Sequence, residues 1–254
     1  MKWLEESKRL VIITNNYCNL QCPRCDTGCD KKYGDHPWRD EPWEVNIKDI
    51  KLLLSKISKH IPVIRLHGGE TTMMDTSKLK DIINLITAYD IPLGILTNGY
   101  NIMALGEEYI SKLDHIVLNG HGINENHLDE IEPQLRAING PTIYRLNRYD
   151  YYDMDWVADN SPKTGEVCVL YGMIAGFYKG VIYPCCGPYY CNEDCKKYMG
   201  DWNVESDKFY ETVQSLDNLP DEFWKDCFMH CAFNGVEQPT INIKDLTTGI
   251  PKPL

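Results

Sequence analysis

The feature that most restricts the fold of this chain is an alternation of predicted strands and helices over roughly its first 160 residues. Five apolar runs are predicted to be strands, at residues 9–16, 62–70, 91–99, 114–122 and 142–149. Helices are predicted between them, at residues 45–60, 76–89, 103–113 and 124–138. Alternation of this kind is typical of βα units around a parallel sheet. We therefore predict an α/β fold.

The predicted strands share polar or glycine-rich residues at their carboxyl ends, in the segments NNYC, HGGE, TNG, NGHG and RLNR. In βα barrels and doubly wound sheets, binding sites are built at that edge of the sheet. The sequence therefore predicts that the chemistry of this first region lies on one rim.

Eleven cysteines are the unusual part of the composition. An odd number cannot all pair in disulfides, and a chain of 254 residues can bury a core without such crosslinks. The sequence has no secretory signal and no apolar run near the ~20 residues of a membrane-spanning helix. Its formal net charge of −11 disfavours binding to long nucleic acids and to anionic membranes. We therefore expect a cytoplasmic monomer whose clustered thiols are reduced and hold metal.

The first cysteines, Cys18, Cys22 and Cys25, follow the first predicted strand with the spacing C-x3-C-x2-C. Three thiolates can hold three irons of a four-iron cluster and leave the fourth iron open to a ligand from outside the protein. The alternative is a zinc site completed by Cys29. Zinc sites usually take two pairs of ligands separated by a longer gap, and this segment places four thiols within 12 residues.

The motifs, in this order, resemble the radical S-adenosylmethionine (SAM) superfamily. The cysteine motif follows the first predicted strand, Gly68-Gly69-Glu70 ends the second, Thr97-Asn98-Gly99 ends the third and Asn119 ends the fourth. The resemblance covers roughly residues 9–160 and implies a partial (β/α)6 barrel of the TIM type. It also implies that a [4Fe-4S] cluster passes one electron to SAM. The resulting 5′-deoxyadenosyl radical would take a hydrogen atom from the substrate.

The resemblance assigns roles to individual residues by position. Cys18, Cys22 and Cys25 would ligate the cluster, which an external donor such as flavodoxin or ferredoxin would reduce. The residues that would contact SAM are Gly68, Gly69 and Glu70 at its amino group, Asn98, Asn119 at its ribose or carboxylate, and Arg145 or Arg148 at its carboxylate. His67, His121 and Arg148 are candidates for the substrate side, and packing is the alternative role of the histidines. One position departs from the family, because Arg24 stands where an aromatic residue beside the adenine is usual.

The later cysteines resemble an auxiliary-cluster module of the twitch or SPASM type. Cys168 and Cys185 flank Gly180 with the spacing C-x11-G-x4-C, and Cys227 and Cys231 are placed to complete a second [4Fe-4S] cluster. Three further thiols are alternative ligands, or hold a second metal, or bind none: Cys186, Cys191 and Cys195. We therefore expect two domains, a barrel in residues 1–160 and a small cysteine-rich domain of a β-hairpin and short helices in residues 161–254.

The reaction that this layout favours is a two-electron oxidation of a small molecule. Hydrogen abstraction would be followed by loss of a proton and of one electron to the auxiliary cluster. Modification of a peptide side chain, as in enzymes that mature ribosomal peptides, is the first alternative, and modification of a nucleotide is the second. A non-catalytic iron–sulfur or zinc scaffold is the alternative from a different class, but a scaffold needs neither Gly-Gly-Glu nor an open iron.

Overall fold

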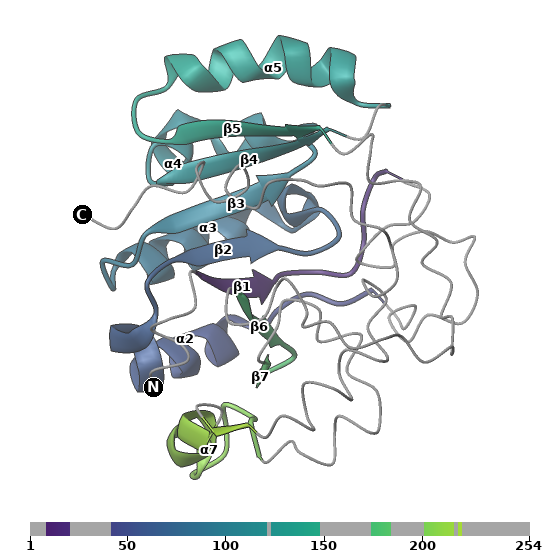
Figure 1. Cartoon of the computed structure of the whole chain (residues 1–254). Coiled ribbons are helices and arrows are strands. Elements are labelled where there is room, and N and C mark those ends of the chain that lie inside the picture. The colour runs from purple at the N-terminus through teal and green to yellow at the C-terminus, as the bar shows by residue number, and fades with distance from the viewer. Residues whose placement is uncertain are drawn as a thin grey trace.

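The computed structural model describes residues 9–20, 42–120, 123–147, 174–183, 201–215 and 218–219, which contain a seven-stranded sheet (Figure 1). The strand order is β5-β4-β3-β2-β1-β6-β7. All neighbouring strands are parallel except the antiparallel pair β6–β7. The strands are β1 (Arg9–Ile13), β2 (Ile64–His67), β3 (Leu93–Thr97), β4 (His115–Gly120), β5 (Thr142–Asn147), β6 (Ile174–Tyr178) and β7 (Val181–Tyr183).

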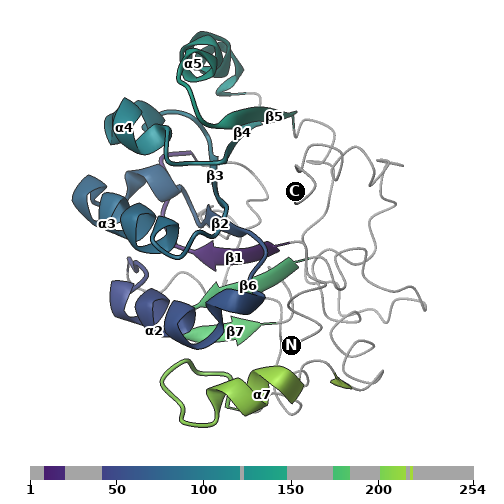
Figure 2. The same cartoon turned by 90° about the vertical axis from the view of Figure 1, so that its left-hand side faces the viewer.

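Helices α2, α3, α4 and α5 lie along one face of this sheet (Figure 2). The helices of the described residues are α2 (Ile47–Ile57), α3 (Thr76–Thr87), α4 (Glu107–Ile110), α5 (Glu125–Ala137) and α7 (Phe209–Ser215). Short 3-10 turns cover Ser58–His60, Thr71–Met73 and Ile102–Leu105. The predicted α/β fold with a parallel sheet is confirmed, and the arrangement is consistent with a partial barrel.

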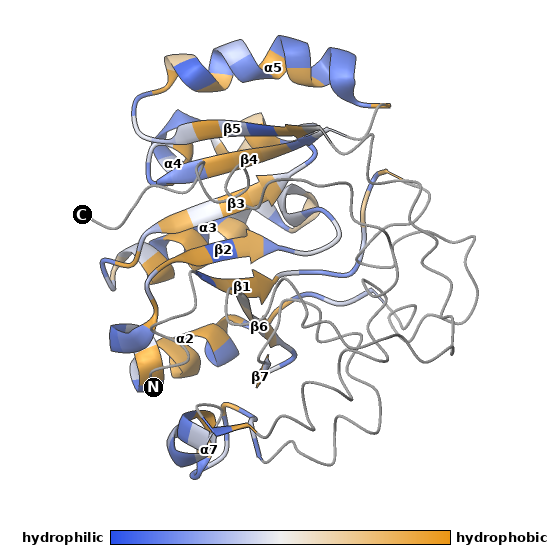
Figure 3. Ribbon diagram, viewed as in Figure 1, coloured by the Kyte–Doolittle hydropathy of each residue, from blue (hydrophilic) through white to orange (hydrophobic). Residues whose placement is uncertain are grey.

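Helices α2 and α3 form where a side-chain N-cap is followed by an apolar stripe. The Asp75 side chain accepts a hydrogen bond from the Lys78 amide (2.9 Å) and begins α3, whose buried face is Leu79, Ile82, Ile83 and Ile86. Hydrophobic residues gather on the central strands, whereas α5 at the edge is largely hydrophilic (Figure 3). Only three side chains of α5 are buried: Leu128, Ile131 and Leu135.

One predicted helix is broken. The sequence predicted a helix over residues 103–113, but the structure has the 3-10 turn Ile102–Leu105 and the four-residue helix α4. Gly106 separates them with φ +78°, a backbone conformation that a helix cannot contain. In contrast, α5 continues through Pro133, although proline in a helix interior often breaks or kinks the helix.

The predicted hairpin is present, and it belongs to the main sheet. β6 pairs in parallel with β1, and the chain returns to β7 through Lys179 and Gly180, both with positive φ. Residues 201–215 pack beside it, because the Ile182 amide donates to Trp202 O (3.2 Å) and the Val204 amide donates to Gly180 O (2.7 Å). The Lys56 ammonium of α2 also donates to the carbonyls of Val204 (2.8 Å) and Ser206 (2.9 Å). The hairpin is therefore part of the main sheet, while the predicted domain boundary near residue 160 lies outside the described residues and stays a prediction. The described residues contain five strands from the βα alternation, and the sixth parallel strand is β6, beside β1.

A polar row crosses the sheet on the side away from the helices. The parallel register aligns Arg65 of β2, Gly94 of β3 and His115 of β4. The Arg65 guanidinium reaches over Gly94 to Nε2 of His115, with Nε at 3.3 Å and Nη2 at 3.2 Å. A Cβ on Gly94 would collide with the imidazole. Burial, reinforced by the positive charges of Arg65 and Arg9, lowers the pKa of His115 to about 3, so the imidazole is neutral.

The described residues contain no helix with the length and apolar character needed to cross a lipid bilayer.

Candidate functional site

The carboxyl ends of β1 and β2 are joined into one polar frame. The pairing of these strands continues beyond the sheet, because the Gly69 amide donates to Asn15 O (3.0 Å) and the Glu70 amide donates to Tyr17 O (2.8 Å). The Asn15 side chain closes the frame by donating to Glu70 O (2.7 Å). A Cβ on Gly68 would lie 2.5 Å from Asn15 Oδ1 and 2.7 Å from Asn15 O. Glycine is therefore the residue that fits at position 68.

The Glu70 carboxylate is held inside this frame and is 2% exposed. Its Oε1 accepts from the Thr72 amide (3.1 Å), the Thr72 hydroxyl (2.6 Å) and the Thr97 hydroxyl (2.7 Å). Its Oε2 accepts from the Asn98 amide (2.6 Å). All four donors are uncharged, and burial raises the pKa of the carboxyl in spite of them. A cation beside this carboxylate would oppose that effect and stabilise the ionised form.

Asn98 connects Glu70 to the first cysteine. The Asn98 side-chain amide donates to Cys18 Sγ (3.6 Å) and to Asn19 Oδ1 (2.8 Å). The half-buried Cys18 sulfur also accepts from the Leu20 amide (3.3 Å). The two motifs that the sequence placed after β1 and β2 are therefore joined through the motif after β3.

The end of β4 joins this group through Asn124. Its side-chain amide donates to the carbonyl oxygens of Asn98 (2.9 Å) and Asn119 (3.0 Å). Among the described residues of this rim, the buried acceptors Asn15 Oδ1 and Asn119 Oδ1 have no hydrogen-bond partner. Leaving buried polar atoms unpaired costs about 1–3 kcal/mol each, so such atoms point to a ligand or an ordered water.

A second network fixes the loop that carries Cys18. The Tyr17 hydroxyl donates to Glu44, whose other oxygen accepts from Lys78 (2.8 Å). Burial opposes ionisation of Glu44, but the hydrogen bonds from Lys78 and Tyr17 hold its pKa below the ordinary value. Burial and the neighbouring Glu44 raise the pKa of Tyr17, so the hydroxyl stays protonated. This network ties the first cysteine loop to α3.

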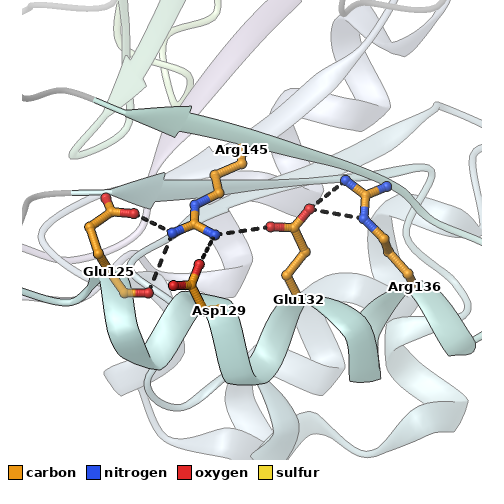
Figure 4. A network of polar contacts seen from close by, with 5 residues as sticks. All are labelled: Glu125, Asp129, Glu132, Arg136 and Arg145. Atoms are coloured by element: carbon orange, nitrogen blue, oxygen red, sulfur yellow. Dashed lines mark hydrogen bonds and ion pairs between the residues drawn. The ribbon is translucent and has the colours of Figure 1, made fainter.

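Arg145 is not brought to this rim. Its guanidinium forms ion pairs with three carboxylates of α5, namely Glu125, Asp129 (2.5 Å) and Glu132 (3.4 Å) (Figure 4). Arg145 is in register with Leu118, which packs in the core, whereas the following pair is Asn119 and Leu146. Successive side chains of a strand point to opposite faces, so Arg145 and Asn119 lie on opposite sides of the sheet. A contact between Arg145 and a SAM carboxylate stays a prediction, and it would require these ion pairs to break.

The remaining sequence predictions divide between described and undescribed parts of the chain. His67 ends β2 half-buried, and its carbonyl accepts from the Thr14 amide (2.6 Å). The others lie outside the described residues: Cys22, Cys25, Cys29, His121, Arg148, Cys168, Cys185, Cys186, Cys191, Cys195, Cys227 and Cys231. Sequence reasoning missed several residues of the site, namely Asn15, Thr72, Asn124 and the Tyr17–Glu44–Lys78 network. The chain gave no signal for Asn124, whereas Asn15 and Tyr17 stand directly before Cys18.

Comparison with known families decides the assignment of the chain. The family described as the radical SAM superfamily matches residues 12–147, which is more than half of the sequence. The chain belongs to the radical SAM superfamily. Members of this family use a [4Fe-4S] cluster and SAM. The match runs from β1 to β5 and contains every strand end described above.

Solved structures of SuiB from Streptococcus suis are similar to this radical SAM protein at low identity. The first, SuiB alone, has a TM-score of 0.40 and 11% identity, covering 80% of this chain and 65% of that one. SuiB bound to the precursor peptide SuiA has a TM-score of 0.42, 12% identity and coverages of 82% and 67%. SuiB bound to S-adenosylmethionine has a TM-score of 0.44, 11% identity and coverages of 87% and 67%. Similarity at this level says nothing about the substrate. A comparison with curated proteins finds no match.

The described residues fit SAM and its cluster chemically. Cys18 supplies a sulfur with two N–H donors around it, as an electron-rich thiolate ligand requires. Glu70 supplies a buried anion with uncharged neighbours, which suits an ammonium group. The unpaired acceptors of Asn15 and Asn119 suit the hydroxyl and amino donors of such a ligand.

Proposed function

We propose that this radical SAM enzyme binds SAM across the ends of β1 to β4, with the Glu70 frame at its amino group and Asn119 at its ribose. The observation that carries this proposal is the buried Glu70 carboxylate, which is linked through Asn98 to Cys18. When bound, the cluster supplies one electron that splits SAM into methionine and a 5′-deoxyadenosyl radical, which removes a hydrogen atom from the substrate.

The residues of this chain orient SAM before that step. The Glu70 carboxylate, whose neighbours are uncharged donors, favours an ammonium group and disfavours a carboxylate. Asn119 Oδ1 needs a donor, which a ribose hydroxyl supplies and a carboxylate does not. We therefore propose the ribose, not the carboxylate, as the partner of Asn119. Cys22 and Cys25 complete the cluster ligands in this proposal.

For the substrate reaction, we propose oxidation of a small molecule. Hydrogen-atom abstraction would leave a substrate radical, which would lose a proton to solvent. Cys168, Cys185, Cys227 and Cys231 would hold an auxiliary cluster able to accept the remaining electron. A peptide substrate is the alternative. The two are separated by incubating the enzyme with reductant, SAM and deuterated candidates, followed by mass spectrometry. Deuterium in 5′-deoxyadenosine with a substrate lighter by two hydrogens supports oxidation, whereas a crosslinked peptide supports the alternative.

The first experiment measures iron, sulfide and 5′-deoxyadenosine anaerobically, in the wild type and in the Cys18→Ala/Cys22→Ala/Cys25→Ala variant. We expect about eight irons in the wild type and about four in the variant, as two four-iron clusters require. We expect 5′-deoxyadenosine from the wild type alone. About four irons with zinc in the wild type would keep the SAM chemistry and remove the auxiliary electron acceptor. Zinc without iron would overturn the proposal in favour of a scaffold.

A further inference from the structure

We propose that Asn98 sets the reduction potential of the cluster bound by Cys18, through the hydrogen bond from its side-chain amide to the cysteine sulfur. This inference rests on the proposed function, because the cluster is taken from it. It gives Asn98 a role different from the SAM contact that its position in the sequence predicted.

The contact is part-buried, and the described residues place a second N–H donor at the same sulfur. Asn98 is 4% exposed, and its Nδ2 lies 3.6 Å from Cys18 Sγ. The other N–H of the same amide has its own acceptor in Asn19 Oδ1 at 2.8 Å. The Leu20 backbone amide is a second donor to Cys18 Sγ at 3.3 Å. Of these two donors to the sulfur, the backbone amide of Leu20 is kept in any side-chain variant, whereas the Asn98 amide can be removed by mutation.

The side-chain amide of Asn98 is held in the orientation that directs its N–H groups at the sulfur. Its Oδ1 accepts from the Tyr100 backbone amide (3.2 Å), which is always a donor. A flip of the side-chain amide would place the Asn98 NH2 group opposite the Tyr100 N–H, so that two donors would face each other. The Asn98 backbone is fixed as well, because its amide donates to Glu70 (2.6 Å) and its carbonyl accepts from Asn124 (2.9 Å).

A donor to a cluster sulfur stabilises the reduced cluster more than the oxidised one, since reduction adds negative charge to the iron and sulfur atoms. The effect is larger in a buried site than in water. Asn98 should therefore raise the reduction potential and make the cluster easier to reduce. It acts through Cys18 and is a positioning residue, because no transferred atom passes through it.

The test is a redox titration of the reconstituted full chain, followed by electron paramagnetic resonance in the absence of SAM. The signal of this cluster is identified by its change when SAM is added. Asn98→Leu removes the donor without adding charge, and Asn98→Asp keeps the acceptor for Tyr100 while replacing the donor with a carboxylate. Asn84→Asp is the matched control, because Asn84 lies exposed on α3 and its Oδ1 accepts from Lys112 (3.0 Å).

We expect Asn98→Leu to shift the reduction equilibrium about tenfold toward the oxidised cluster, which is ~59 mV for a one-electron couple. We expect a larger shift in the same direction for Asn98→Asp and none for Asn84→Asp. A purely structural role would lower the iron content and leave the potential of the remaining clusters unchanged, and that result would overturn the inference. A wild type without a SAM-responsive cluster would instead refute the proposed function.

Discussion

The rim at the strand ends and the helix side of β5 differ in the partners of their charged side chains. At the rim, Glu70 is surrounded by four uncharged donors, and no ion pair to it is found among the described residues. On the helix side, Arg145 is surrounded by three carboxylates of α5. The carboxylate at the rim therefore has no cationic partner among the described residues, whereas the guanidinium on the helix side is paired with carboxylates.

This difference separates a binding site from a structural contact. Burying an unpaired carboxylate is costly, so a chain retains one where a cation is to be bound. The ion pairs of Arg145 hold the edge helix α5 against the sheet. They matter for stability because α5 buries only a few apolar side chains. The comparison predicts that substitutions at Glu70 change ligand binding and that substitutions at Arg145 change stability.

The largest effect is expected from Glu70→Gln, which removes the charge and keeps the size of the side chain. We expect the Kd for SAM, measured by isothermal titration calorimetry on the reconstituted protein, to rise about 10- to 100-fold, since a charge-assisted hydrogen bond contributes about 1.5–3 kcal/mol. Glu130→Gln on the exposed side of α5 is the control and should bind SAM as the wild type does. If Glu70→Gln and the wild type bound SAM with equal affinity, Glu70 would not be the partner of a bound cation, and the proposed difference between the two regions would be wrong.

The second effect is expected from Arg145→Met, which leaves the carboxylates of α5 facing one another. We expect the free energy of unfolding in urea to fall by about 1–3 kcal/mol and the Kd for SAM to change less than twofold. Arg136→Met is the matched control, because Arg136 pairs with Glu132 alone at 2.5 Å and is more exposed. Its loss should cost about 0.5 kcal/mol or less. A tenfold loss of SAM affinity in Arg145→Met would restore the sequence-based role of Arg145 at the SAM carboxylate.

A third and smaller effect sharpens the role of the unpaired acceptor at β4. Asn119→Ala should raise the Kd for SAM about five- to tenfold, as the loss of one neutral hydrogen bond predicts. The same variant should bind methionine as the wild type does, because methionine has the amino and carboxylate groups of SAM and lacks the ribose. A parallel loss of methionine binding would assign Asn119 to the amino acid part of SAM.

These two regions also show what the sequence could predict. The strand ends were predictable because polar residues after buried runs mark the functional edge of a parallel sheet, and Gly68, Glu70, Asn98 and Cys18 do come together there. Arg145 lies on β5 as predicted, but the sequence did not indicate which face of the sheet its side chain occupies. Successive residues of a strand point to opposite faces of the sheet. In a partly exposed edge strand such as β5, the pattern of apolar residues does not show which residues point to which face.

Other features were beyond the sequence because they depend on contacts between distant segments. Nothing near residues 174–178 indicates pairing with Arg9–Ile13, since the two segments meet only in the folded sheet. Asn124 likewise gains its role from two carbonyl oxygens on different strands. Gly106 is different, because it is a local feature of the sequence. Its positive φ divides the segment that the apolar spacing predicted as one helix.

A fourth prediction concerns His115, which is buried like Glu70 but has its partner inside the protein. Its pKa is lowered to about 3 by burial and by Arg65, whereas in the unfolded chain it is about 6.5. The unfolded state therefore binds a proton that the folded state excludes as the pH falls below about 6.5. This contribution to stability is complete above that pH and is lost progressively down to about pH 3, at up to ~1.4 kcal/mol per pH unit. Urea unfolding at pH 7 and pH 5 should show a smaller loss of stability in His115→Gln than in the wild type. Equal losses of stability in both proteins would mean that His115 takes up a proton in the folded sheet as readily as in the unfolded chain. The row of Arg65, Gly94 and His115 would then accept an added charge, as the rim is proposed to do.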